Sequence, residues 1–397
     1  MERSPELSPH DPEAHLQLVR ESRARRATDI HLDPLQDGYQ IRLRIDGLLV
    51  PWLALEKDAG NRLVNQFKTA GGIDPGTAFT PLGARRKLML ADDDVIDCRI
   101  TLAPCLSGPK LAIRLLDASR FDHRITSLGL SEVGRDRFDH WLKTLNGMFL
   151  VTGPTASGKT TTLYALLHEL ASENRHIVSV EDPVEYEIDG INQIQVDERH
   201  GLDFAEGLRT ILRLDPDHAM IGELREPQSA YAAVSAAIAG HVILTTLHSR
   251  DAVSAVTALR NFGLAGHQIA SALGVVVNQR LVRTLCEKCR EEGELLPGEL
   301  EWFERERLSP PERTWKPVGC DACDGSGFFG RTGLFEVWRM DEADYEMLLA
   351  DADEDTLRDH LDAEGHTGLW EDATAKIEDG ITTFAEVQRL GLSLPWE

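Results

Sequence analysis

Short stretches of alternating apolar and polar residues mark the first third of the chain. The alternation predicts strands over 29–32, 39–45, 48–50, 86–90, 95–102 and 110–116, and helical spacing predicts helices over 13–26 and 60–69. The Asp46-Gly47 pair is typical of a tight hairpin turn. We therefore expect a flexible tail over 1–12, a small α+β domain over 13–117, and a linker over the polar segment 118–130.

The rest of the chain has a different pattern, in which apolar runs alternate with helical segments. Strands are predicted over 148–151, 176–180, 219–221 and 241–246, with helices over 161–167, 204–214 and 229–239. Strands separated by helices favour an α/β fold, a parallel sheet with helices on both faces, over 131–397. Ligands of such sheets bind beyond the carboxyl ends of the strands. The residues expected at that edge are Gly153, Glu181, Glu223 and His248.

A phosphate-loop motif, G-x-x-x-x-G-K-[ST], lies between the first predicted strand and helix of this domain. Its glycines let the backbone curl so that N–H groups face a phosphate, and the positive end of the helix adds to the attraction. Lys159 would reach the β and γ phosphates of ATP, and the Thr160 hydroxyl would hold Mg²⁺. A Gly/Ser/Thr turn before an ordinary helix is the alternative, which the flanking elements disfavour. The expected nucleotide-binding residues are Gly153, Pro154, Thr155, Ala156, Ser157, Gly158, Lys159, Thr160 and Thr161.

Carboxylates and a histidine follow the neighbouring strands. Glu223 is expected to orient or deprotonate the attacking water. Glu181 begins an acidic cluster with Asp182 and Glu185, which could hold Mg²⁺ through water or position the attacking water; a turn cap is the alternative. His248 could sense the γ phosphate by a hydrogen bond or could be structural, and the sequence leaves both interpretations open.

Two C-x-x-C pairs, Cys286/Cys289 and Cys320/Cys323, are separated by 30 residues. Four thiolates in this spacing are typical of a tetrahedral Zn²⁺ site, whereas a thioredoxin-like redox site uses a single pair. The polar segment 291–317 between the pairs is expected to be a looped-out excursion. We expect the metal to hold this region together, because its apolar content is low.

Composition narrows the class of protein. Among 397 residues, 66 acidic side chains outnumber 42 basic ones, which gives a formal net charge of −24 and argues against bulk nucleic-acid binding. No apolar run of about 18 residues and no signal-peptide pattern is present, so we expect a cytoplasmic protein with peripheral membrane contact at most. Cys98 and Cys105 have no partner pattern and are expected to be buried thiols.

Taken together, these motifs resemble the secretion ATPase superfamily, the motors of type II secretion and type IV pilus assembly (GspE/PilB-like). The resemblance covers about residues 27–383, and the tetracysteine element is typical of the assembly members rather than the retraction motors. The matching motifs are an opening motif (28–34), R-x-D-G (44–47), an aspartate box (181–185), a Walker B region (213–225), a histidine box (240–248) and the segment 279–283 before the cysteines.

The resemblance implies a RecA-like phosphate-loop domain preceded by a small PAS-like domain. It places a zinc-binding insertion at 284–333 and a C-terminal helical part at 340–397. It also implies that arginines of the small domain approach the phosphates, and Arg99 and Arg114 match the arginine-bearing strands of the family. Arg85 could be a third, although its sequence context departs from the family pattern.

In function, the resemblance implies a homohexameric ATPase that uses ATP, Mg²⁺ and Zn²⁺. It would power pseudopilus or pilus assembly at the cytoplasmic face of the inner membrane, with the cytoplasmic domains of platform proteins as partners. Three alternatives remain open at this stage. They are a DNA-uptake pilus motor, a zinc-ribbon nucleic-acid-binding protein with a regulatory ATP site, and a scaffold of the same fold that does not hydrolyse ATP.

Overall fold

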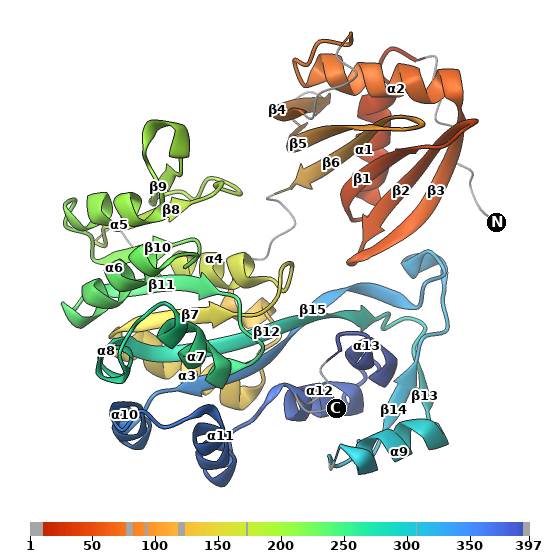
Figure 1. Ribbon diagram of the computed structural model, residues 1–397. Helices are drawn as coiled ribbons and strands as arrows, with labels where there is room; N and C mark the ends of the chain where they lie inside the picture. Colours follow the sequence, from red (N-terminus) through yellow and green to blue (C-terminus); the bar gives the residue numbers. More distant parts are fainter. Residues whose placement is uncertain are drawn as a thin grey trace. The chain divides into compact units, whose positions relative to one another are not determined.

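A computed structural model describes residues 11–76, 82–91, 94–117, 124–171, 174–306 and 308–391. The chain divides into two compact units, Met1–Phe121 and Asp122–Glu397 (Figure 1). Most of the predicted tail and half of the predicted linker lie outside the described residues, so the boundaries proposed from the sequence stay predictions.

The first unit is an antiparallel sheet with two helices against one face. The sheet has six strands in the order β3-β2-β1-β6-β5-β4. Every helix and strand expected here is present, and β1, β3 and β4 are each at least twice as long as predicted. The elements are α1 (Ala14–Ala24), β1 (Ala27–Pro34), β2 (Gly38–Ile45), β3 (Leu48–Glu56), α2 (Lys57–Ala70), β4 (Leu82–Ala91), β5 (Asp94–Cys105) and β6 (Gly108–Leu116).

Alternation along these strands separates an apolar face from a charged one. Ile100 and Ile113 face the helices and are fully buried, whereas their neighbours Arg99 and Arg114 are exposed. Arg99 is paired in register with Arg85 on one side and with Arg114 on the other, so three arginines stand in one row across β4, β5 and β6.

The two cysteines of the first unit differ in exposure. Cys98 is buried within β5, as expected from its alternation with apolar residues. Cys105 is exposed at the end of the same strand, so the prediction that it is a buried thiol was wrong. The apolar pattern of β5 stops before Cys105, which leaves that thiol outside the core.

The second unit is built on a seven-stranded sheet in the order β15-β12-β7-β11-β10-β8-β9. All neighbouring strands are parallel except β15, which runs antiparallel to β12 at one edge. The sequence predicted the four central strands and missed the three others. The strands are β7 (Met148–Thr152), β8 (Ile177–Glu181), β9 (Asn192–Gln195), β10 (His218–Ile221), β11 (Val242–Leu247), β12 (Leu273–Leu285) and β15 (Phe328–Arg339).

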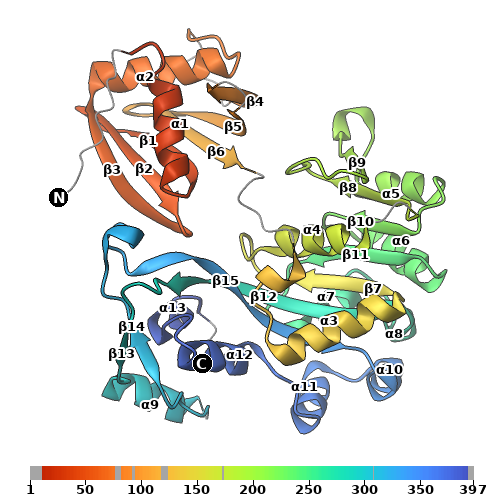
Figure 2. The same ribbon diagram turned by 180° about the vertical axis from the view of Figure 1, so that it is seen from behind.

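Helices cover both faces of this sheet, as the alternating pattern requires. Helices α3 and α4 pack on one face, and α5 to α8 pack on the other, so α7 and α8 lie in front of the sheet in Figure 1 and α3 lies in front in Figure 2. The helices are α3 (Glu132–Thr144), α4 (Lys159–Leu170), α5 (Phe204–Leu212), α6 (Pro227–Ile238), α7 (Ala252–Asn261) and α8 (Gly266–Ala272). None of the helices in the described ranges combines the length and apolar character that a bilayer crossing needs.

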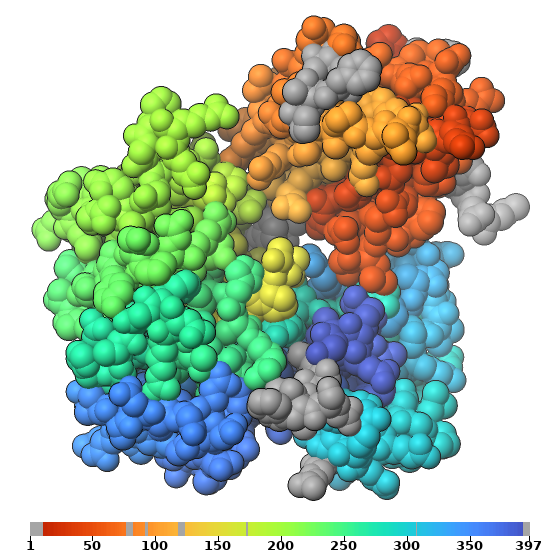
Figure 3. Space-filling view, viewed as in Figure 1, coloured from red at the N-terminus to blue at the C-terminus, as the bar shows by residue number. Residues whose placement is uncertain are grey.

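The C-terminal region is helical, and its first two helices, α10 and α11, pack against α8 and α7, respectively. Their atoms form the blue region directly below the teal one in the space-filling view (Figure 3). The segment expected to be a looped-out excursion is instead folded. Phe303 of its helix is fully buried against Trp370 and Phe384 of the C-terminal helices. The predicted loop was wrong because its few large apolar residues share a core with a distant segment. The elements are β13 (Glu291–Gly293), α9 (Pro297–Arg305), β14 (Thr314–Lys316), α10 (Glu342–Leu349), α11 (Glu354–Ala363), α12 (Leu369–Glu378) and α13 (Phe384–Gln388).

Candidate active site

The phosphate loop connects the end of β7 to the start of α4. Gly153 and Gly158 have φ angles of +138° and +91°, which side-chain-bearing residues rarely adopt. A Cβ built on Gly153 would lie 2.5 Å from the carbonyl oxygen of Gln279, and one on Gly158 would lie 2.8 Å from the Gln279 amide nitrogen. Helix α4 begins at Lys159, two residues earlier than predicted, because Gly158 ends the loop in a left-handed conformation.

Three of the predicted site residues meet at the carboxyl edge of the sheet. Gly153, His248 and Glu223 follow β7, β11 and β10, which are neighbours in the sheet. Lys159 Nζ donates to the Gly153 carbonyl over 2.9 Å, and His248 Nδ1 lies 3.0 Å from the same oxygen. The other ring nitrogen of His248 is 2.8 Å from Glu223 Oε1. The loop backbone, a cation and a carboxylate are therefore joined through one histidine.

Arg225 clamps two carboxylates of this edge. Its guanidinium donates to Glu223 Oε2 over 2.8 Å and to Asp182 Oδ2 over 2.9 Å. The hydrogen bond to Glu223 raises the pKa of Arg225 further above its already high value. Glu223 is thus held between a guanidinium and an imidazole, which fixes the direction of its carboxylate.

Glu181 is at the same edge, at the end of β8, but its side chain is surrounded by donors. It is only 3% exposed and accepts hydrogen bonds from the hydroxyls of Tyr164 and Ser179 and from the Gln193 amide. Burial, together with the nearby Glu181, raises the pKa of Tyr164, so the phenol remains a donor. These contacts are structural, and a catalytic part for Glu181 stays a prediction.

The loop has the features of a phosphate cradle. Within the described part of the chain the buried Ser157 hydroxyl has no hydrogen-bond partner. Lys159 Nζ donates to the Gly153 and Pro154 carbonyls and lies 3.4 Å from His248 Nδ1. Burial lowers the pKa of Lys159, and the charge of Glu223 opposes that shift. Thr160 is exposed on the first turn of α4, where its hydroxyl would hold Mg²⁺. These residues fit a Mg²⁺-bound polyphosphate.

Sequence reasoning missed a polar group on β12, beside the loop. Gln279 is buried, accepts a hydrogen bond from the Thr162 hydroxyl over 2.7 Å, and donates to the Ser157 carbonyl over 2.7 Å. Asn278 donates to the Thr152 hydroxyl over 2.8 Å. The signal for this group was an Asn-Gln-Arg run directly after three valines in the sequence.

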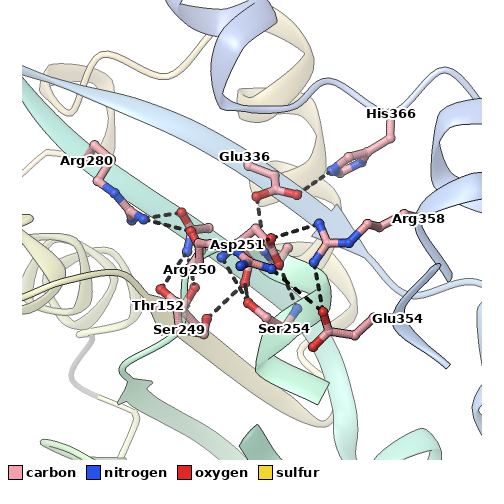
Figure 4. A network of polar contacts seen from close by, with 12 residues as sticks. Thr152, Ser249, Arg250, Asp251, Ser254, Arg280, Glu336, Glu354, Arg358 and His366 are labelled. Atoms are coloured by element: carbon pink, nitrogen blue, oxygen red, sulfur yellow. Dashed lines mark hydrogen bonds and ion pairs between the residues drawn. The ribbon is translucent and has the colours of Figure 1, made fainter. Parts of the chain in front are cut away.

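A second polar network ties the segment after His248 to the C-terminal helices (Figure 4). Asp251 caps α7 by accepting from the Ser254 backbone N–H, and it also pairs with Arg358 of α11 over 2.8 Å. Burial alone would raise the pKa of Asp251, but the bonds from Arg358 and Ser254 outweigh burial and lower it. Glu336 of β15 accepts from the next backbone N–H, that of Ala252. The start of α7 is therefore held by both β15 and α11.

The four cysteines predicted to bind zinc come together. Three pairs of their sulfur atoms, Cys286/Cys320, Cys289/Cys323 and Cys320/Cys323, are 3.9, 3.9 and 3.8 Å apart, and all four lie within 4.8 Å of one another. A tetrahedral site with Zn–S bonds of about 2.3 Å needs sulfurs about 3.8 Å apart. Backbone N–H groups of Cys320 and Gly327 point at the Cys323 sulfur, as in metal-bound thiolate turns. The cluster is compatible with Zn²⁺.

Arg99 and Arg114 belong to the first unit and are described there alone. Arg114 donates to Asp29 over 3.0 Å, and Arg85 pairs with Asp97 over 2.9 Å. Arg99 and Arg114 are both exposed residues of the charged face of this sheet. Their approach to a nucleotide stays a prediction.

Known proteins are similar to this chain in both sequence and fold. The family described as type II/IV secretion system protein matches residues 12–389. The type II secretion system ATPase E of Vibrio cholerae is 39% identical over 366 residues, which are 92% of this chain and 72% of that protein. The type IV pilus assembly ATPase PilB of Thermus thermophilus is 38% identical over 375 residues, 94% of this chain and 42% of that protein.

Solved structures agree at the level of the fold. The Legionella pneumophila ATPase DotB superposes with a TM-score of 0.72 at 19% identity, covering 98% of both chains. The pilus retraction motor PilT gives a TM-score of 0.63 at 20% identity, covering 94% of this chain and 96% of that one. Because the family match covers residues 12–389 and the relatives are 38–39% identical, the chain belongs to the type II/IV secretion system protein family.

Proposed function

We propose that this protein is an ATPase motor of type II protein secretion or type IV pilus assembly. The observation that carries the proposal is that Lys159 and His248 both contact the Gly153 carbonyl while the other ring nitrogen of His248 contacts Glu223, in a family whose relatives are named as ATPases. Phosphoryl transfer needs a fixed loop, a cation and a directed carboxylate, and this edge of the sheet supplies all three.

Each side chain has a proposed task. Lys159 binds the β and γ phosphates, and the Thr160 hydroxyl holds Mg²⁺, which supplies charge stabilisation when bound. Glu223 orients the attacking water and accepts its proton, while His248 links Glu223 to the loop. Arg99 and Arg114 stabilise the charge of the transition state. Glu181, at the end of β8, helps to hold Mg²⁺ through water or to position the attacking water.

The assembly and its setting follow the family. The proposed active form is a homohexamer that couples ATP hydrolysis to movement of the two units. Its partners would be cytoplasmic domains of inner-membrane platform proteins, so the motor would work at the cytoplasmic face of that membrane. We further propose that Zn²⁺ occupies the tetracysteine cluster. Light scattering with and without a non-hydrolysable ATP analogue measures the oligomeric state.

The test separates binding from turnover. We expect Glu223→Gln to bind ATP normally and to lose turnover by on the order of a hundredfold or more, because the carboxylate acts on water rather than on the nucleotide. Lys159→Ala should lose ATP binding. The control is Glu198→Gln, which removes an exposed carboxylate of the same unit outside the site. Full turnover in Glu223→Gln would contradict the assigned chemistry, and normal ATP binding by Lys159→Ala would remove the nucleotide from this loop.

The alternatives are less well supported. A DNA-uptake motor would use the same site, but the relatives reported above are named for protein secretion and pilus assembly. A zinc-ribbon protein that binds nucleic acid conflicts with the net charge of −24. A non-hydrolysing scaffold would have no need for Lys159, Thr160 and Glu223 together, and a phosphate-release assay distinguishes it from a motor.

A further inference from the structure

Arg280 of β12 is a buried positive charge beside the phosphate loop that the proposed chemistry does not use. The residue is 8% exposed, and its Nη1 would lie 3.2 Å from a Cβ built on Gly153. Removing a charge from water is costly unless an opposite charge or strong hydrogen bonds compensate for it. The hydrogen-bond partners of Arg280 therefore show whether its positive charge is compensated within the protein.

All the hydrogen-bond partners found for Arg280 among the described residues are neutral. Nη1 donates to the Asn278 side-chain oxygen and to the Gln279 carbonyl, both over 3.0 Å. Nη2 donates to the Arg250 carbonyl over 2.7 Å, and these two arginines are labelled in Figure 4. No carboxylate among the described residues forms an ion pair with it, and Glu336 and Asp251 act on its charge only from a longer range. The guanidinium is thus held in place by dipoles, and its charge is not cancelled by direct contact.

The uncancelled charge acts on the loop. Burial is the main cause that lowers the pKa of Lys159, Glu223 opposes it, and the positive charge of Arg280 adds to the lowering. Lys159 is itself hydrogen-bonded to the Gly153 carbonyl, so two cations flank one glycine. Fixed cations in a partly buried site create a positive potential that attracts an anion.

We propose that Arg280 is a positioning residue for the nucleotide, a second cation that attracts the polyphosphate across the Gly153 backbone without touching it. By holding the Arg250 carbonyl, it also fixes the segment after His248 relative to the loop. The proposal rests on the proposed function, that this loop binds ATP. An arginine suits the task because it stays charged at every physiological pH, even when it is buried.

The experiment compares ATP with ADP, because ATP carries one more negative charge. Dissociation constants are measured by calorimetry for the full-length wild type, Arg280→Met and Arg280→Lys. We expect Arg280→Met to weaken ATP binding about tenfold, the order of one charge–charge interaction at a partly buried site, and ADP binding less. Arg280→Lys should keep most of the preference for ATP, since it keeps the charge while losing the fork of donors.

A purely structural part for Arg280 gives a different result. It would weaken ATP and ADP binding equally, and Arg280→Lys would then be as impaired as Arg280→Met; either finding overturns the proposal.

Near-ultraviolet circular dichroism checks the folding of each variant. If Arg280→Met does not fold, Arg280→Gln, which keeps an N–H donor for the Arg250 carbonyl, is compared in the same way. If Lys159→Ala loses ATP binding while Arg280→Met keeps the wild-type ratio of ATP to ADP affinity, only this inference fails. Unchanged ATP binding by Lys159→Ala would end the proposed function.

Discussion

Gly153 shows how much of the site depends on one backbone conformation. At a φ of +138° it lets the chain turn beneath the Gln279 carbonyl and brings its own carbonyl to Lys159 and His248. Any side chain here meets a backbone atom that cannot rotate away. The loop can therefore keep its shape only with glycine at this position.

Replacing Gly153 with alanine should displace the loop. We expect Gly153→Ala to lose ATP binding by tenfold or more and to cost about 2 kcal/mol of unfolding free energy, because both the φ angle and the 2.5 Å contact are unfavourable. Calorimetry with ATP and urea unfolding provide the two measurements.

Gly365→Ala is the matched control for this prediction. Gly365 also has a positive φ, +69°, but among the described residues no atom lies within 4 Å of an added Cβ, and it lies outside the site. It should lose about 1 kcal/mol of stability and keep ATP binding. Normal ATP affinity in Gly153→Ala would show that the loop does not need this conformation.

At the scale of elements, the tetracysteine cluster joins two ends of a folded insertion. Phe303 packs that insertion on the C-terminal helices, so the metal would add to an apolar core rather than replace it. We expect Cys289→Ser to lose stoichiometric Zn²⁺ by elemental analysis and to lower the melting temperature by several degrees without unfolding the second unit.

Cys105→Ser is the control for the metal prediction, because Cys105 is an exposed thiol outside the cluster. It should keep both the metal and the melting temperature. Freshly purified, reduced protein without stoichiometric metal would refute the zinc assignment. Complete unfolding on metal removal would instead show that the shared apolar core is too weak to hold the insertion.

The contact between α7 and α11 is a second element-scale feature. Asparagine caps a helix about as well as aspartate, so Asp251→Asn isolates the ion pair with Arg358 from the cap. We expect Asp251→Asn to cost about 2 kcal/mol, and Asp251→Ala to cost about 1 kcal/mol more. Urea unfolding measures both.

The contribution of Asp251 to the free energy of unfolding should depend on pH in one direction. The pKa of Asp251 is lower in the folded chain, so its contribution is fully present above the unfolded value and is lost as pH falls through the folded one. The difference between wild type and Asp251→Asn should stay constant from pH 7 to 5 and shrink only below about pH 4. A difference that vanishes near pH 6 would point to a histidine instead.

At the scale of the whole molecule, catalysis is proposed to need both units. Arg99 and Arg114 are on the first unit, whereas the phosphate loop is on the second. We expect Arg99→Ala and Arg114→Ala to lower kcat by on the order of a thousandfold with little change in ATP affinity, because they would act on the transition state. Steady-state ATPase assays and calorimetry measure these two quantities.

The control for this prediction is Arg62→Ala, an exposed arginine of α2, the helix that packs against the opposite, apolar face of the same sheet. It should turn over ATP at the wild-type rate. If both strand arginines could be removed without loss of kcat, the first unit would have no direct part in hydrolysis.

Local residue spacing and the order of strands and helices were sufficient to predict much of the fold of the second unit. They predicted its four central strands and the edge shared by Gly153, Glu223 and His248, because the carboxyl ends of parallel strands meet at one edge. Local pattern could not predict the fold of the insertion, since Phe303 is buried only by residues far along the chain. The antiparallel β15 was missed for the same reason, as its partner β12 lies more than 40 residues earlier.

The sequence by itself determined the phosphate loop, the residues after the strands and the spacing of the cysteines, because each depends on neighbours along the chain. Only the tertiary structure decided what surrounds them. It placed β12 beside β7, which brought Gln279 and Arg280 to the loop, and it enclosed Glu181 among donors. The physical reason is that strand order and burial depend on packing between distant segments, which no local pattern specifies.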